Sequence, residues 1–295
     1  MLSVSRKNIP KKEQIRRLIA ELGLRDIEDT MSLAEACGSE AIRPLREYVL
    51  CGKPNGIYQG RQYAILALAK LGAKEVIMEY LNHPKKDIGD PVTEFGEEAV
   101  ESIAARELAR WQTEGTFQFL IDYARKHKRI GALEALGEFK RKEAVPLLID
   151  AVKDDYYRPV AESALSKLGQ IAYHGLLRAA TLIAESDREI PSVLRGGHTV
   201  LTLLANLTVS KKDWRLLRKL LFHSNAEIVS GAAQIAAKVA PKSDKAIAVR
   251  QIAAIYRSAD WRTKIEMEDC LTQLLPELEV GPEIERLRQK RPKSR

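Results

Sequence analysis

The sequence predicts an all-α protein made of about eight stacked helix pairs. Of its 295 residues, 45% are apolar but only 6% are aromatic, and this composition favours helices over sheets. Apolar residues recur with the helical period of 3.6. A segment rich in alanine and leucine returns every 28 to 40 residues, as is typical of repeat architectures.

The first helix of each predicted pair is the Ala/Leu segment, which commonly ends in Leu-Gly. In YAILALAKLG, residues 63–72, the apolar side chains of Ala64, Ala67, Leu68 and Leu71 follow the i, i+3, i+4, i+7 pattern and predict one buried face. The small alanines would allow neighbouring helices to approach closely. Further copies lie at 32–38, 102–111, 130–139, 161–169, 198–207, 231–239 and 268–275.

A second amphipathic helix is predicted two to six residues after each first helix. Pro44 and Pro146 fall in the first turns of two of them, where a missing N–H is tolerated. The second helices are predicted at 40–50, 73–81, 116–124, 143–152, 173–183, 214–222 and 246–256. Three longer loops, at 53–60, 82–96 and 186–198, are candidates for a binding edge, although tolerated surface loops explain them equally well.

The clearest copies of the repeat resemble a known family. The segment GALEALGEFKRKEAVPLLIDAVKDD at 131–155, followed by YYRPVAESALSKLG at 156–169, resembles HEAT repeats, and more narrowly those of the phycobilisome-lyase type. The resemblance is good over 60–170 and implies a right-handed α-α superhelix, a HEAT-like solenoid of the armadillo-like kind. Tetratricopeptide repeats would need a rigid period of ~34 residues, which these spacings lack.

Positive charge gathers at the two ends of the chain. The formal net charge is +8; residues 1–17 carry +5, residues 283–295 carry +4 and the remainder carries −1. We therefore expect a basic N-terminal arm at 1–17, a solenoid at 18–282 and a basic tail at 283–295. The tail offers possible phosphate contacts at Arg286, Arg288, Lys290 and Arg291.

The sequence also indicates where the protein works. No run approaches the ~18 apolar residues of a membrane helix, and the first residues lack the apolar segment of a signal peptide. The three cysteines form no CxxC pair, so a disulfide framework or zinc ribbon is not expected. We expect a cytoplasmic protein that does not contact membranes. The sequence does not specify its oligomeric state.

Three arginines occupy equivalent places at the starts of first helices. They are Arg61, Arg129 and Arg158, and the last of them follows Asp154 and Asp155. The family resemblance implies that such an arginine ties its helix to an acidic turn or a carbonyl nearby. Their predicted role is therefore structural.

The second helices carry two aligned polar columns. If these helices line the concave face, as in HEAT-like solenoids, the groove would run from acidic with tyrosines to basic and suit a partner with a basic segment. The alternative is a solvated face whose tyrosines flank the core. The predicted partner-binding residues are Glu47, Tyr48, Glu79, Tyr80, Asp122, Tyr123, Asp150, Arg178, Arg218, Lys219 and Arg250.

Sequence motifs for catalysis are absent. The chain contains no HExxH, no P-loop, no GxSxG and no GxGxxG, and its five histidines show no metal-ligand spacing. We expect no metal, no cofactor and no enzymatic activity. Trp111 is expected in the core, and Trp214 and Trp261 are expected to pack at repeat joints.

Three functions are compatible with this pattern. The favoured one is a non-catalytic scaffold that presents its concave face to a protein. The first alternative is a nucleic-acid binder that uses its basic termini, of the kind that the resemblance to HEAT-like DNA-repair glycosylases implies. The family resemblance alone suggests a more remote alternative, a bilin-lyase-like enzyme, because one fold serves many functions.

Overall fold

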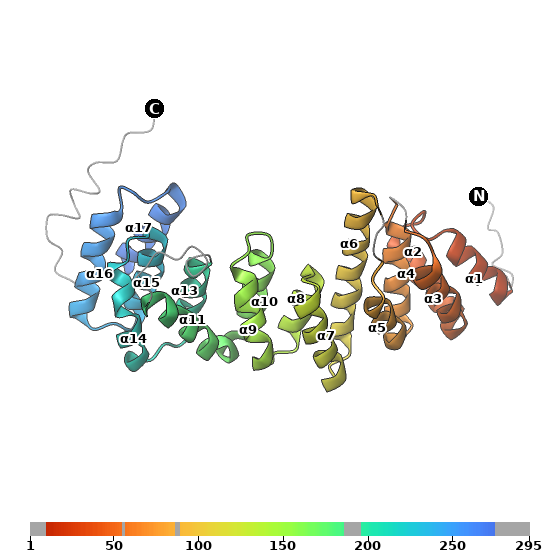
Figure 1. The fold of residues 1–295 in the computed structure, drawn as a ribbon, viewed down its shortest axis with the longest axis horizontal. Helices are drawn as coiled ribbons and strands as arrows, with labels where there is room; N and C mark the ends of the chain where they lie inside the picture. The colour runs from red at the N-terminus through yellow and green to blue at the C-terminus, as the bar shows by residue number, and fades with distance from the viewer. Residues whose placement is uncertain (1–9, 55–56, 86–88, 186–195, 275–295) are drawn as a thin grey trace, which may run out of the picture. The chain divides into compact units, whose positions relative to one another are not determined.

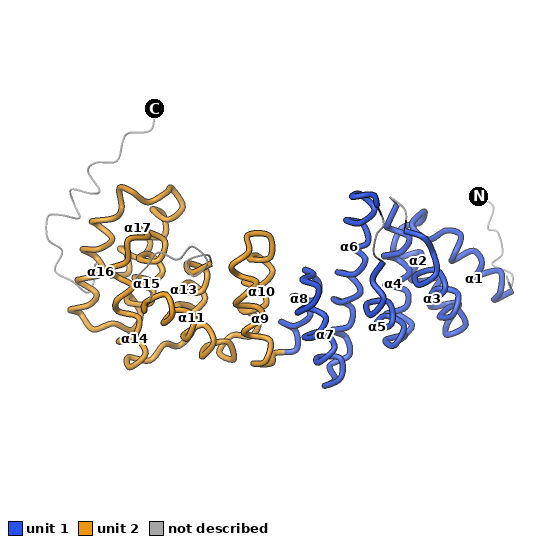
Figure 2. The backbone as a smooth tube through the Cα atoms, in the orientation of Figure 1, with its two compact units in different colours: residues 1–139 blue, residues 140–295 orange. Residues whose placement is uncertain are grey.

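The protein is all-helical throughout the part of the chain that its computed structural model describes (Figure 1). That part comprises residues 10–54, 57–85, 89–185 and 196–274. The chain forms two compact units, residues 1–139 and 140–295 (Figure 2). In each unit, helices that follow one another along the chain pack side by side, as the repeats predict.

Unit 1 consists of helices that alternate between two layers. The first helices pack on one another in the order α2, α4, α6 and α8, and α1 covers α2 and α3. The helices of unit 1 are α1 (Lys11–Ala20), α2 (Ile27–Cys37), α3 (Ile42–Cys51), α4 (Gln59–Lys70), α5 (Lys74–Asn82), α6 (Pro91–Glu107), α7 (Glu114–Lys126) and α8 (Ile130–Glu138).

Unit 2 repeats the arrangement. Here α13 packs on α11 and α15, and α15 packs on α16 and α17. Its helices are α9 (Val145–Val152), α10 (Arg158–Leu168), α11 (Tyr173–Glu185), α13 (Gly197–Ala205), α14 (Lys211–Leu217), the 3₁₀ helix η5 (Arg218–Phe222), α15 (Ala226–Val239), α16 (Lys242–Ile255) and α17 (Trp261–Leu274).

Side-chain caps define where several helices begin. Asp26 accepts a hydrogen bond from the Asp29 amide at the start of α2, and Asp90 does the same for the Thr93 amide at the start of α6. Such caps satisfy amides that lack a partner in the first turn. Gly38 ends α2 with a φ of 63°, a conformation that glycine adopts without strain.

The first helices of unit 1 approach one another closely because their contact positions are small. Ala104 of α6 and Ala132 of α8 are fully buried. Between these helices, the Gly131 amide donates to Ser102 Oγ at 2.7 Å. A β-carbon at Gly131 would lie only 1.7 Å from the Ser102 carbonyl oxygen, so this crossing requires glycine.

The all-α repeat fold is confirmed, and the boundaries differ in two places. Residues 91–96 form the first turns of α6 rather than a loop, because Asp90 caps the helix and Pro91 occupies its first position. Residues 11–17 belong to α1, so the boundary expected at 17 falls inside a helix. Trp214 is buried as expected, whereas Trp261 is 75% exposed, so its expected packing at a repeat joint is wrong.

Two expectations fall on residues outside the described part. They are the basic tail at 283–295 and most of the loop at 186–198. Among the described helices, none is both long and apolar enough to span a bilayer.

The close crossing of α6 and α8 can be tested with two glycines. We expect Gly131→Ala to lower the free energy of unfolding by about 1–3 kcal/mol, because the new methyl group must displace backbone. Gly115, in the first turn of α7, has no atom near its β-position. Gly115→Ala should therefore be neutral or raise stability by up to about 1 kcal/mol. Urea denaturation followed by far-UV circular dichroism measures both; equal effects would contradict the close crossing.

Candidate functional site

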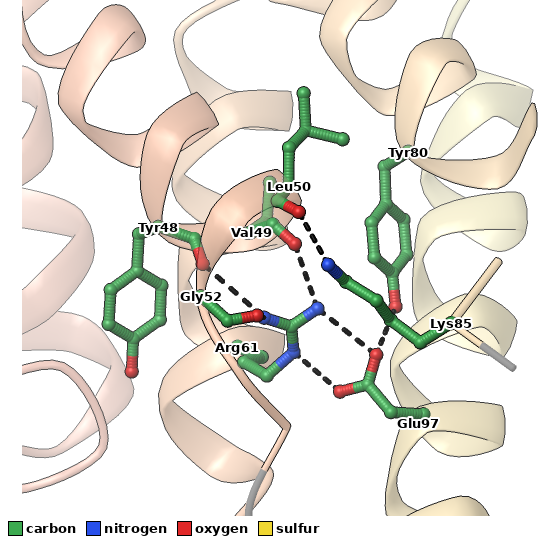
Figure 3. Close-up of polar contacts among 8 residues, drawn as sticks. All are labelled: Tyr48, Val49, Leu50, Gly52, Arg61, Tyr80, Lys85 and Glu97. Carbon is green, nitrogen blue, oxygen red and sulfur yellow. Dashed lines mark hydrogen bonds and ion pairs between the residues drawn. The ribbon is translucent and has the colours of Figure 1, made fainter. Parts of the chain in front are cut away.

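A buried ion pair joins α4 to α6 in unit 1. Arg61, in the first turn of α4, and Glu97, near the start of α6, are each only 3% exposed. The Arg61 guanidinium donates from Nε and Nη2 to the two carboxylate oxygens of Glu97, at 2.5 and 3.0 Å (Figure 3). Two successive first helices are thus tied together away from water.

Arg61 also holds the end of α3. Its Nη2 donates to the Val49 carbonyl at 2.8 Å, and its Nη1 donates to the carbonyls of Tyr48 and Gly52, both at 3.3 Å (Figure 3). These carbonyls belong to the last turn of the helix and to the residue after it, where backbone acceptors lack helical partners. One guanidinium therefore fixes the start of the loop that leads to α4.

A second network of the same kind lies one turn further along α6. Glu101, also 3% exposed, accepts hydrogen bonds from Arg129 Nε at 2.7 Å and from the Tyr123 hydroxyl at 3.0 Å. Arg129 immediately precedes α8 and also pairs with Glu98 at 2.9 Å. The long helix α6 therefore carries two buried carboxylates, one bound toward α4 and the other toward α8.

Two of the three tyrosines predicted to bind a partner belong to these networks and not to an open surface. Tyr80 is 1% exposed and donates its hydroxyl to Glu97 at 3.1 Å. Burial raises the pKa of Tyr80 and of Tyr123 far above the usual range, and the neighbouring carboxylate raises it further. Both phenols therefore stay protonated and donate hydrogen bonds. The expectation that Tyr80 and Tyr123 contact a partner is wrong, because the buried carboxylates draw them inward. Tyr48 is half-buried.

The structural role predicted for the three equivalent arginines is confirmed. Arg61 and Arg129 bind the carboxylates of α6. In unit 2, Arg158 donates to the Val152 carbonyl at 3.0 Å and pairs with Asp155. Arg61 and Arg158 satisfy carbonyls at the end of the preceding helix, and Arg129 binds two carboxylates of α6, so all three are engaged within the fold.

The acidic residues predicted to bind a partner are at least partly exposed, and each has a basic partner. In three of the four pairs the partners are three or four residues apart in the chain, at 3.0 to 3.3 Å. Arg46 of α3 reaches Glu79 of α5 and lowers the pKa of Glu79. The second helices therefore do not present the bare acidic face that the sequence suggested. The pairs are Glu47 with Arg43, Glu79 with Arg46, Asp122 with Arg125 and Asp150 with Lys153.

The basic column of unit 2 is a true surface feature. Arg178, Lys219 and Arg250 are exposed. Arg218 is half-exposed and donates from Nε to Asp244 at 2.8 Å. We define the basic stripe as five exposed residues along α14 and η5. Three are basic, and two are apolar side chains that are at least half exposed. The five residues are Lys212, Arg215, Leu216, Lys219 and Phe222.

A second surface lies where the loops of unit 1 meet. A β-carbon at Gly23 would lie 2.8 Å from the Gly60 amide, and one at Gly96 would lie 2.8 Å from the Tyr58 ring. The segments around residues 23, 58 and 96 are therefore in contact along one edge. This loop edge exposes four large apolar side chains, which are 61% to 81% exposed: Leu24, Ile57, Val92 and Phe95.

Exposed carboxylates lie near these apolar side chains in the sequence, at the starts of α2 and α6. Glu28 and Glu94 are exposed in the first turns of α2 and α6, beside the capping residues Asp26 and Asp90. Hydrogen bonds from Thr93 hold the pKa of Asp90 below its usual range. Acidic residues are favoured at the starts of helices by the helix dipole, which explains part of this acidity. The helix dipole does not explain why large apolar side chains are exposed there. The loop edge is therefore an acidic and apolar surface.

The sequence did not reveal the buried carboxylates, and it indicated the loop edge only as a candidate binding edge formed by long loops. A signal for Glu97 and Glu101 exists, since they continue the buried stripe formed by Ala104 and Leu108 with the same helical spacing. For the loop edge, the signal was the length of the loops at 53–60 and 82–96. Among the described residues, no cluster of histidine, cysteine and acidic side chains is arranged to hold a metal ion.

Comparison with known proteins gives one family match. A family model described as HEAT repeats matches residues 95–169, a segment that contains Glu97, Glu101, Arg129 and Arg158. The match does not single out the phycobilisome-lyase type. No curated protein matches the chain significantly.

The buried pair can be tested by removing one charge or both. We expect Arg61→Met to lower the free energy of unfolding by about 3–5 kcal/mol, because it leaves a buried carboxylate without its cation. Arg61→Met/Glu97→Met should be the more stable of the two variants. Arg43→Met, which breaks an exposed pair, should change stability by less than about 1 kcal/mol. A double variant less stable than Arg61→Met would contradict the coupling.

Asp244 should make unit 2 sensitive to acid. Burial favours its neutral form, but hydrogen bonds from Trp214 and Arg218 outweigh burial and hold the pKa of Asp244 below its usual value. A depressed pKa contributes stability above the unfolded-state pKa that is lost as the pH falls through the folded-state pKa. Between pH 7 and pH 3, Asp244→Asn should therefore lose less unfolding free energy than the wild type. The exposed control Asp269→Asn should behave as the wild type does; an unchanged slope for Asp244→Asn would refute this role.

Proposed function

Because the chain is a HEAT-like repeat protein, we propose that it is a non-catalytic scaffold for a protein partner. HEAT repeats generally serve as protein-interaction scaffolds. The observation that carries the proposal is the loop edge of unit 1, which exposes Leu24, Ile57, Val92 and Phe95 together with carboxylates at the starts of α2 and α6. The partner that fits this surface has a basic segment with apolar side chains.

Exposing several large apolar groups together to water is unfavourable. Contiguous exposed apolar side chains rimmed by polar ones are typical of interaction surfaces. Burying one large apolar side chain is worth roughly 1.5–3 kcal/mol, whereas carboxylates at the rim mainly select and orient the partner. The segments of the edge also support one another through the Gly96–Tyr58 contact, so the partner meets a preformed surface.

The absence of enzymatic activity is part of this proposal. The carboxylates of Glu97 and Glu101 are buried and bound by arginine and tyrosine, an arrangement that supports a structural role for them. A cytoplasmic location remains a prediction. The nucleic-acid alternative finds support in the basic stripe, while its other candidate contacts, Arg286, Arg288, Lys290 and Arg291, lie outside the described residues.

The proposal is tested by capture with the tagged protein, with and without nuclease, and by binding of the purified partner. We expect Val92→Ser/Phe95→Ser to weaken that binding at least tenfold, about 1.4 kcal/mol, without unfolding the protein. Tyr156→Ser, which removes an equally exposed aromatic side chain in unit 2, should have no effect. Capture of nucleic acid alone, or binding indifferent to the loop edge, would refute the proposal.

A further inference from the structure

The two units differ in net charge. Residues 1–139 contain 21 acidic and 21 basic residues and are neutral overall, whereas residues 140–295 contain 19 acidic and 27 basic residues, a net charge of +8. Such an asymmetry opposes contacts between unit 2 of one molecule and unit 2 of another, and contacts between unlike units avoid that repulsion.

Matching apolar side chains accompany the opposite charges of the loop edge and the basic stripe. On the loop edge, Val92 and Phe95 are three residues apart on α6, so they share one helix face. On the basic stripe, Leu216 and Phe222 flank Lys219 at intervals of three residues. Each surface therefore offers two large apolar groups together with charges of one sign.

The basic charges of the stripe have few local carboxylates to neutralise them. On α14 and η5 the one acidic residue is Asp213, which accepts hydrogen bonds from Ser210 and Tyr173. Both α16 and α15 pack on η5. The one acidic residue of α16 is Asp244, which is bound by Trp214 and Arg218, and that of α15 is Glu227, which is exposed at the start of the helix. Asp213 and Asp244 are bound within their own unit, so Lys212, Arg215 and Lys219 outnumber the one exposed carboxylate of these helices.

We propose that the loop edge of one copy of this chain docks on the basic stripe of a second copy. The inference rests on the proposed function, because it names a partner for the loop edge. The interface joins two different surfaces and is therefore heterologous. Each copy in a pair keeps one unused surface, so further copies can add head to tail.

The proposal is tested by sedimentation of nuclease-treated protein at concentrations up to about 100 µM. The wild type should show a mass that rises with concentration and falls when salt screens the charges. Two variants each lose one surface: Val92→Ser/Phe95→Ser on the loop edge, and Leu216→Ser/Lys219→Glu/Phe222→Ser on the stripe. Alone, each variant should be monomeric. Mixed in equal amounts, they should form a one-to-one pair and nothing larger, since one intact surface of each kind remains.

Three results would overturn the proposal. They are a wild type that stays monomeric, a mixture that fails to pair although the wild type associates, and association that vanishes with nuclease, which would assign the stripe to nucleic acid. Tyr156→Ser should associate like the wild type, and circular dichroism checks that every variant is folded. If the wild type is monomeric but a captured partner still requires Val92 and Phe95, this inference fails and the proposed function stands.

Discussion

The ion pair between Arg61 and Glu97 is the interaction on which the loop edge depends. A charged group buried without a partner would destabilise the fold by several kcal/mol, so each side chain constrains the other to one position. Through Arg61 the pair also fixes the carbonyls of Tyr48, Val49 and Gly52. These groups begin the loop that carries Ile57, and Glu97 follows Phe95 by two residues. The buried pair therefore anchors the segments that carry Ile57 and Phe95.

The two units use different buried polar groups to join neighbouring helices. Unit 1 places two carboxylates on the long helix α6 and surrounds them with arginine and tyrosine from the neighbouring helices. Unit 2 keeps Arg158 at the equivalent place but uses Asp244 to bind Trp214 and Arg218. The basic side chains of the stripe, Lys212, Arg215 and Lys219, stay exposed. The two units thus differ in surface character.

The sequence predicted the helix pairs because burial on one face of a helix depends only on local spacing, as the positions of Ala64, Ala67 and Leu68 illustrate. It also predicted the structural role of Arg61, Arg129 and Arg158. It failed for Tyr80 and Tyr123, because spacing places a tyrosine on a helix face but does not show which buried carboxylate its hydroxyl can reach. The loop edge depends on contacts between segments far apart in sequence, such as Gly96 with Tyr58, which no single-helix pattern contains.

The central claim is that the buried pair holds the loop edge in place. Native-state hydrogen exchange of Glu97→Gln, compared with the wild type, tests it most directly, since exchange reports local opening of each segment. The account predicts faster exchange in α4 and in the first turns of α6, with α13 and α15 of unit 2 unchanged. Unchanged protection in α4 and α6, or an equal loss in both units, would contradict it.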